Sequence, residues 1–184
     1  MKRADRILQQ WRIRRASPWI RDDARVLDVG CFDDALFAAL GRRLGSGVGL
    51  DPLLTRPVER DRFRLLPGHF PDVQLADGSF DAITMLAVLE HVPPAELDRW
   101  AQACARLLTP GGLVVATVPA PAVDHVLDVL MRLRIVEGMS VEEHHGFKPE
   151  MAPVVFRRAG LVLAHQSRFQ LGLNNLFVFA KPAP

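Results

Sequence analysis

Short runs of continuous hydrophobic residues alternate along this chain with stretches in which hydrophobic residues recur every three or four positions. Residues 26–29 and 113–118 are continuous runs typical of strands buried on both faces, whereas residues 35–40 and 94–108 carry helical spacing. Because strands and helices take turns along most of the chain, the pattern predicts parallel strands joined by right-handed crossovers.

The pattern predicts seven strands in all, and the last two form a hairpin with its turn at residues 171–175. The glycine-rich residues 41–47 are expected to form a turn before the second strand. We therefore predict a single domain over residues 1–184: an α/β, Rossmann-like three-layer αβα sandwich whose mostly parallel seven-stranded sheet has one antiparallel strand from the C-terminal hairpin. The predicted strands are residues 26–29, 48–51, 62–66, 82–86, 113–118, 161–165 and 176–180, and the predicted helices are residues 4–16, 35–40, 94–108, 122–134 and 150–159.

The first predicted strand runs through Gly30 directly into a helix, and Asp33 and Asp34 lie between the two elements. A strand that passes through a tight turn into a helix N-terminus forms a crevice toward which backbone N–H groups point. We expect a small ligand to bind there. Asp33 is also the better candidate for capping the helix that follows.

Asp51 ends the second predicted strand, about 20 residues after the glycine turn, where a bound nucleoside presents its ribose hydroxyls. A carboxylate at this position can accept a hydrogen bond from both hydroxyls. The alternative is a turn-initiating aspartate before Pro52. A later loop on the same edge of the sheet offers His69 or Phe70 as a surface for an aromatic base.

The N-terminal segment, residues 1–22, contains a predicted helix rich in arginine. One interpretation is a basic amphipathic helix that makes a weak contact with anionic lipid or with an acidic substrate. The interpretation we favour is a helix that packs Ile7 and Trp11 on the sheet and leaves its cationic side chains in water. Its arginines are Arg3, Arg6, Arg12, Arg14 and Arg15.

Composition changes this picture little. The 184 residues carry a formal net charge of only +2, which does not by itself indicate a nucleic-acid partner. Cys31 and Cys104 are too far apart for a CxxC metal pair or a disulfide framework, so we expect no metal and a reduced, cytoplasmic protein. No apolar stretch is long enough to cross a bilayer.

Taken together, five short segments resemble the class I S-adenosylmethionine-dependent methyltransferases, and the resemblance runs from about residue 26 to residue 181. Each segment alone is weak, but their joint order and spacing are specific. The segments are VLDVGC at 26–31, GLD at 49–51, FD at 80–81, LEHV at 89–92 and LLTPGG at 107–112.

The resemblance implies that S-adenosylmethionine is the cofactor and S-adenosylhomocysteine the product. It implies that Asp28 and Gly30 line the methionine end of the cofactor and that Asp51 holds the ribose. The remaining implied cofactor contacts are Cys31, Phe32 and Pro52 around the cofactor, His69 and Phe70 beside adenine, and Leu86 and Ala87 beneath the transferring methyl.

The glycine loop departs from the family pattern. Glycine usually recurs at alternate positions in this loop, whereas this chain has Gly30, Phe32 and Asp34, which could narrow or reshape the crevice. Charge still favours the methyl donor over a dinucleotide, because Asp33 and Asp34 would repel a pyrophosphate but favour a sulfonium and an ammonium.

For the reaction we expect direct in-line displacement of the methyl group in a dry pocket. His144 or His145 is the candidate general base, with His91 less favoured; the alternative is a pair of exposed or loop-holding histidines. Residues 120–150 are expected to form the wall that selects the acceptor.

A small-molecule, sugar or lipid-linked acceptor is the expected class. Enzymes that methylate amines of nucleic-acid bases usually carry Asp/Asn-Pro-Pro-aromatic where this chain has MLAV at 85–88, so no nucleic acid is expected. Two alternatives stay open: a noncatalytic binding or regulatory subunit of the same fold, and an NAD-dependent oxidoreductase. The oligomeric state is not predicted.

Overall fold

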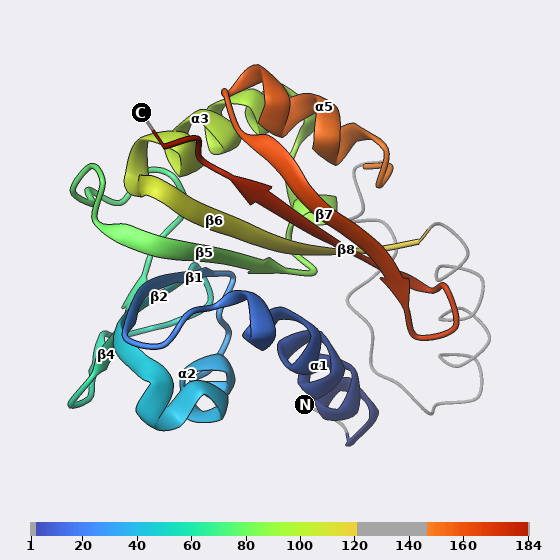
Figure 1. The fold of residues 1–184 in the computed structure, drawn as a ribbon. Helices are drawn as coiled ribbons and strands as arrows, with labels where there is room; N and C mark the ends of the chain where they lie inside the picture. The colour runs from blue at the N-terminus through green and yellow to red at the C-terminus, as the bar shows by residue number, and fades with distance from the viewer. Residues whose placement is uncertain (1–2, 121–146, 184) are drawn as a thin grey trace.

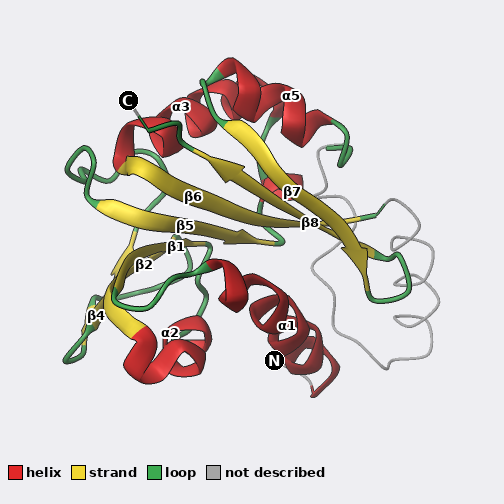
Figure 2. Cartoon of the chain, viewed as in Figure 1, coloured by secondary structure: helices red, strands yellow, loops and turns green. Residues whose placement is uncertain are grey.

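The computed structural model describes residues 3–120 and 147–183. A central sheet is covered by α3 (Leu97–Leu107) and α5 (Met151–Arg158) on one face and by α1 (Arg3–Ala16) and α2 (Ala35–Leu40) on the other (Figure 1). Figure 2 shows the same three layers by secondary structure. The predicted αβα sandwich is therefore confirmed.

Within the described residues, eight strands form one sheet in the order β3-β4-β2-β1-β5-β6-β8-β7. The strands are β1 (Ala24–Val29), β2 (Leu44–Asp51), β3 (Val58–Glu59), β4 (Phe63–Pro67), β5 (Phe80–Leu86), β6 (Leu108–Pro119), β7 (Val162–Phe169) and β8 (Asn174–Ala180). Short 3₁₀ turns lie between helices and strands: η1 (Ser17–Trp19), η2 (Gly41–Arg43), η3 (Leu89–His91) and η4 (Pro94–Glu96).

The sheet is mostly parallel, as predicted. The strands β4, β2, β1, β5 and β6 pair in parallel, and β8 is antiparallel to both of its neighbours, β6 and β7. The seven predicted strands are all present. The eighth, β3, has only two residues and pairs antiparallel with β4, which is too short for a hydrophobic pattern to reveal.

The prediction of a turn over residues 41–47 was wrong for most of that segment, because β2 begins at Leu44. Its glycines are there for close packing. A Cβ on Gly47 would lie 2.7 Å from the Phe37 ring, and one on Gly49 would lie 2.5 Å from Leu65 and 2.9 Å from the Cys31 sulfur. Glycine at these positions lets α2 and the loop after β1 approach the strand closely.

The helix α1 was placed correctly along the chain, but its predicted packing was wrong. Ile13 and Ala16 are buried against the sheet, whereas the side chains of Ile7 and Trp11 are 51% and 47% exposed. At 100° per residue Ile13 lies almost opposite Trp11 on the helix. Gln9 shares the buried side, because the N-terminal part of α1 lies over the acidic loop after β1.

The remaining boundaries moved by a few residues. Strand β6 starts at Leu108, five residues early, with an irregular register between Phe80 and Ala82 on its partner β5. Asn174 and Asn175, expected in the hairpin turn, begin β8 and are buried. Gly160 follows α5 with a φ of +82°, the left-handed conformation in which many helices end. The predicted helix at 122–134 lies outside the described residues.

Three groups of buried side chains hold the layers together. The largest lies between the sheet and α3 with α5, and includes Phe156 stacked on Phe179 with ring centroids 4.4 Å apart. A second group centres on Phe37 of α2, and a third joins Ala16 of α1 to β6 and β8. The sheet is thus buried on both faces, and the carboxyl ends of its parallel strands are free to form a site.

Candidate functional site

The loop that joins β1 to α2 has the backbone shape of a glycine loop although only one of its residues is glycine. Gly30 has a φ of +71° and Phe32 a φ of +54°, both in the left-handed region that favours glycine. A Cβ on Gly30 would lie 2.6 Å from Val88 Cγ2, so a larger residue would be strained by the positive φ and would have to displace Val88. Phe32 is 50% exposed, so its ring extends away from the core instead of filling the turn.

Asp51 fastens this loop to the end of β2. Its carboxylate is 5% exposed; Oδ2 accepts a hydrogen bond from the Phe32 backbone N–H at 2.8 Å, and Oδ1 accepts one from Leu53 at 2.8 Å. The sequence placed Asp51 beside the loop, and the structure brings the two together. Each carboxylate oxygen has a further lone pair with which to accept a bond from a ligand hydroxyl.

Asp28 lies beneath the loop, and its carboxyl group has a strongly raised pKa. Burial raises its pKa to about 7, Thr84 opposes the shift by donating a 2.6 Å hydrogen bond to Oδ1, and the charges of Asp33 and Asp51 raise it further. Burial disfavours a carboxylate that has no cation nearby. A ligand that brings positive charge would relieve this cost. The buried Asp28 carboxyl therefore fits a cofactor that carries a sulfonium and an ammonium.

Asp33 connects the loop to two helices. Its Oδ1 accepts a bond from the backbone N–H of Ala35, the first residue of α2, at 3.0 Å, and another from Gln9 Nε2 of α1 at 2.9 Å. Asp33 thus bonds the first backbone N–H of α2 from the position before the N-cap, whereas the N-cap residue itself, Asp34, makes no side-chain cap bond. The bond from Gln9 places α1 against the crevice.

The end of β5 lies next to the loop, because β5 pairs with β1. Leu86 and Ala87 are partly exposed at this end, Ala87 has a φ of +62°, and its backbone N–H donates to the Thr117 carbonyl at 3.0 Å. Cys31 is 5% exposed, and burial raises its pKa well above the usual range. Cys31 is therefore a neutral thiol that packs in the core around α2 and lies close to Gly49 of β2.

The other predicted cofactor contacts differ in exposure. His69 and Pro52 are exposed, whereas Phe70 is 5% exposed and packs edge-on against Trp100 with ring centroids 5.0 Å apart. His144, His145 and most of the predicted acceptor wall at 120–150 lie outside the described residues. His91 is partly buried in η3.

Sequence reasoning missed the polar residues that support the site. Thr84 is a fully buried hydroxyl on β5, and a lone threonine in an otherwise apolar run was its only signal. Asp81 was noted within a motif without a role. It accepts bonds from the Arg25 backbone N–H at 2.9 Å and from Thr109 Oγ1 at 3.2 Å, and it pairs with Arg21 at 3.0 Å.

These contacts make Asp81 a structural tie at the amino ends of the strands, opposite the crevice. Its bonds from Arg25 and Arg21 hold its pKa well below the ordinary range, although its burial acts in the other direction. The arginines, the threonine and this carboxylate join the starts of β1, β5 and β6. These contacts fix the register of the three strands at their amino ends, and so position the carboxyl ends of β1 and β5 next to each other.

The site so built defines a class: a Rossmann-like domain with carboxylates at the carboxyl ends of β1 and β2 and no glycine-rich cradle for a pyrophosphate. Residues 2–166 match the family model described as "Methyltransferase domain", so the chain belongs to the methyltransferase domain family. The resemblance to the class I S-adenosylmethionine-dependent methyltransferases is confirmed, and S-adenosylmethionine is the cofactor that this membership supports.

A curated relative, a ubiquinone biosynthesis O-methyltransferase from Xanthomonas axonopodis pv. citri, is 35% identical over 155 residues. The match covers 76% of this chain and 63% of the relative, so the chain spans less than two thirds of that protein's length.

Two solved structures share the fold. The Burkholderia thailandensis 1,6-didemethyltoxoflavin-N1-methyltransferase, solved with S-adenosylhomocysteine, superposes with a TM-score of 0.68 at 17% identity, covering 93% of this chain and 78% of that one. The [4+2]-cyclase SpnF superposes with a TM-score of 0.70 at 14% identity, covering 98% and 82%. The second shows that this fold also serves other chemistry.

Proposed function

We propose that the protein transfers a methyl group from S-adenosylmethionine to a hydroxyl oxygen of a small aromatic acceptor, as an O-methyltransferase of the kind named for its curated relative. The observation that carries the proposal is the 35% identity to a ubiquinone biosynthesis O-methyltransferase over most of this chain. The acid-lined crevice at the ends of β1 and β2 supports the cofactor part of the proposal.

The cofactor supplies an electrophilic methyl group on a sulfonium, and the protein's task is binding and alignment. Asp51 would hold the ribose hydroxyls while its backbone contacts keep the loop closed around them. Asp28 and Asp33 would provide negative charge near the methionine end. Leu86 and Ala87 would form the apolar floor that excludes water where the methyl group leaves.

A phenolic acceptor needs to lose its proton near the moment of attack, since a phenol has a pKa of about 10 in water. His144 and His145 remain the proposed general bases for that proton. Replacing both by glutamine should lower kcat by roughly 100-fold or more while leaving the affinity for S-adenosylhomocysteine unchanged. Unchanged turnover in the double variant would remove them from the reaction.

The direct experiment incubates the purified protein with S-adenosylmethionine and a panel of phenols, catechols, amines and carboxylates. S-adenosylhomocysteine formation and a product heavier by one methylene are expected with a phenol or catechol. The Asp51→Ala variant should lose this activity. Methylation of amines alone would overturn the oxygen assignment.

A noncatalytic protein of the same fold is the second candidate, favoured by Phe32 at a position where the family usually has glycine. Against it, Phe32 adopts the left-handed backbone that glycine would adopt, so the loop keeps its shape. Tight S-adenosylhomocysteine binding without turnover of any acceptor would favour this second candidate.

A further inference from the structure

The outer side of α1 presents large apolar side chains to solvent. Ile7 and Trp11 are 51% and 47% exposed, and four residues apart they lie on the same side of the helix. Arg14 and Arg15 flank this side toward the C-terminal end of α1, one on either side of the direction of Trp11, and both are exposed. The side that faces water thus combines an aliphatic and an aromatic residue with two cations.

The β7–β8 hairpin lies beside this helix. A hollow of about 290 Å³ is lined by Trp11, Arg14 and Arg15 from α1 and by Phe169 and Gln170 from the hairpin. Leu171 follows at the tip and is fully exposed. We call this surface the α1–hairpin face; its residues are Ile7, Trp11, Arg14, Arg15, Phe169, Gln170 and Leu171.

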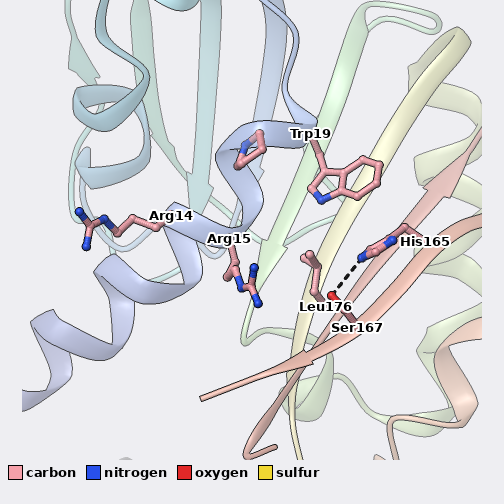
Figure 3. Close-up of a pocket in the computed structure, with 7 residues that line it drawn as sticks. Arg14, Arg15, Trp19, His165, Ser167 and Leu176 are labelled. Carbon is pink, nitrogen blue, oxygen red and sulfur yellow. Dashed lines mark hydrogen bonds between the residues drawn. The ribbon is translucent and has the colours of Figure 1, made fainter. Parts of the chain in front are cut away.

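A second hollow of about 320 Å³ adjoins the first, because Arg14 and Arg15 line both. Figure 3 shows Arg15 pointing toward β7 and β8, while Arg14 points away from the strands on the other side of α1. His165 closes the far wall. Its ring lies 4.7 Å from the Trp19 ring, centroid to centroid, at a tilt of 35°, and its Nε2 is hydrogen-bonded to Ser167 Oγ at 3.0 Å.

Among the described residues, no acidic side chain compensates the charge of this face. None of the described residues that line either hollow is acidic, and within residues 5–120 and 147–183 neither Arg14 nor Arg15 forms an ion pair. The Arg15 guanidinium lies 5.9 Å from the centroid of the Phe169 ring, which supports the cation over an apolar surface.

The tip of the hairpin keeps an apolar residue in water at a conformational cost. Gln170 and Leu171 have φ values of +51° and +55°, a region that residues with a side chain occupy rarely. Leu171 is thus held in water next to Gln170, which lines the first hollow together with Trp11.

We propose that the α1–hairpin face docks on the surface of an anionic lipid bilayer. Arg14 and Arg15 would contact headgroup phosphates on either side of α1, and the hollows toward which Arg15 points have room for such groups. Ile7, Trp11 and Leu171 would enter the boundary between headgroups and acyl chains, where tryptophan and aliphatic residues flanked by arginine bind best. In the described residues no helix is long and apolar enough to cross a membrane, so the contact is peripheral.

The exposed apolar residues distinguish this occupant from a soluble anion or a nucleic acid. Either of those would use the arginines but would leave Ile7 and Leu171 in water. A bilayer satisfies the cations and the apolar tips at the same time. The inference rests on the surface alone and is independent of the proposed methyl transfer.

The experiment is co-sedimentation of the full chain with vesicles of phosphatidylcholine alone and of phosphatidylcholine with phosphatidylglycerol in about equal parts. We expect binding to the anionic vesicles only, weakened by salt. Each arginine near an anionic surface contributes about 1 kcal/mol, so Arg14→Gln with Arg15→Gln should weaken binding roughly 30-fold. Ile7→Ser with Leu171→Ser should weaken it about tenfold or more, because both lose buried apolar area.

Arg157→Gln with Val162→Ser is the matched control, since it removes one exposed arginine and one 57% exposed apolar residue away from this face. The control should bind vesicles like the wild type, and thermal unfolding should show that all variants are folded. Equal binding by the Ile7→Ser/Leu171→Ser variant, no binding of the wild type to anionic vesicles, or complete displacement by soluble glycerol phosphate would each overturn the proposal.

Discussion

Asp28 is the residue whose chemistry the fold changes most. Its folded pKa of about 7 lies well above the usual value near 3.9, so the folded protein holds a proton between these pH values that the unfolded chain has lost. The contribution of Asp28 to stability is therefore greatest below about pH 4 and is lost as the pH rises through about 7. The Thr84 bond lowers this cost without removing it.

Asp28→Asn removes the buried charge and keeps an oxygen for Thr84 to donate to. We expect the variant to be more stable than the wild type at pH 8, by about 2–4 kcal/mol, and the difference to shrink toward pH 4. Urea unfolding across this range measures the difference. A constant difference at every pH would contradict the assigned cause.

The same group should make cofactor binding depend on pH. The cationic cofactor favours ionised Asp28, so affinity for S-adenosylmethionine should fall as the pH is lowered from 8 to 6, up to about tenfold per unit below the pKa. Calorimetry at several pH values measures this. The Asp28→Asn variant should show a flatter profile, and an equally steep one would assign the dependence to another group.

Two substitutions at Phe32 distinguish the contribution of its ring from that of its backbone conformation. Phe32→Gly and Phe32→Ala both remove the ring, but only glycine adopts a φ of +54° without strain. We expect the glycine variant to be about 1 kcal/mol more stable than the alanine variant, measured by thermal unfolding.

Both variants keep the backbone N–H that Asp51 accepts. Binding of S-adenosylhomocysteine should therefore survive in both. Loss of binding in both would show that the ring itself contacts the cofactor, and equal stability would contradict the strain.

At the scale of single residues, the sequence was informative where a residue type is chemically rare at its position. Gly30 and Asp51 follow from the strand-turn-helix pattern and from an acid at a strand end, and the structure brings both to one crevice. Thr84 and Gln9 act through contacts between segments far apart in sequence, so no local pattern indicates their roles.

At the scale of elements, α1 shows why hydrophobic spacing alone misassigns a face. Ile7 and Trp11 have helical spacing, yet Ile13 and Ala16 are the buried residues. Spacing indicates which residues share a side of a helix but not which side meets the sheet. Gln9 lies on the side of α1 that covers the loop after β1, where its side-chain amide donates a hydrogen bond to the Asp33 carboxylate.

This packing makes a stability prediction for α1. Ile13→Ala should cost about 2–4 kcal/mol, because it opens a cavity between α1 and the sheet. Ile7→Ala, at an exposed position on the same helix, should change stability by less than about 0.5 kcal/mol. Chemical denaturation of the two variants is the measurement, and similar losses would contradict the assigned face.

Strand β2 shows a second limit of sequence patterns. Glycines at 45, 47 and 49 have the composition of a turn, but they lie in a strand. Glycine is needed at 47 and 49 because Phe37 and Leu65 leave no space for a Cβ there. Tertiary packing overrides local preference there. The two-residue β3 was not predicted for the simpler reason that it has too few residues for a pattern.

At the scale of the molecule, the alternation of strands and helices was enough to predict the layers and the mostly parallel sheet. Parallel strands must be joined by crossovers, and these bring the carboxyl ends of β1, β2 and β5 to one edge. The acceptor side could not be obtained in the same way. It depends on residues 120–150, most of which lie outside the described part of the chain.

The central claim is that the crevice between β1, β2 and α2 binds S-adenosylmethionine through Asp51. Calorimetric titration of the folded wild type and of Asp51→Ala tests it, with Asp61→Ala as the control because Asp61 is an exposed acid away from the crevice. We predict saturable one-to-one binding for the wild type and the control, and at least about tenfold weaker binding, or about 1.4 kcal/mol, for Asp51→Ala. No binding by the wild type, or equal affinity for Asp51→Ala, would contradict the claim.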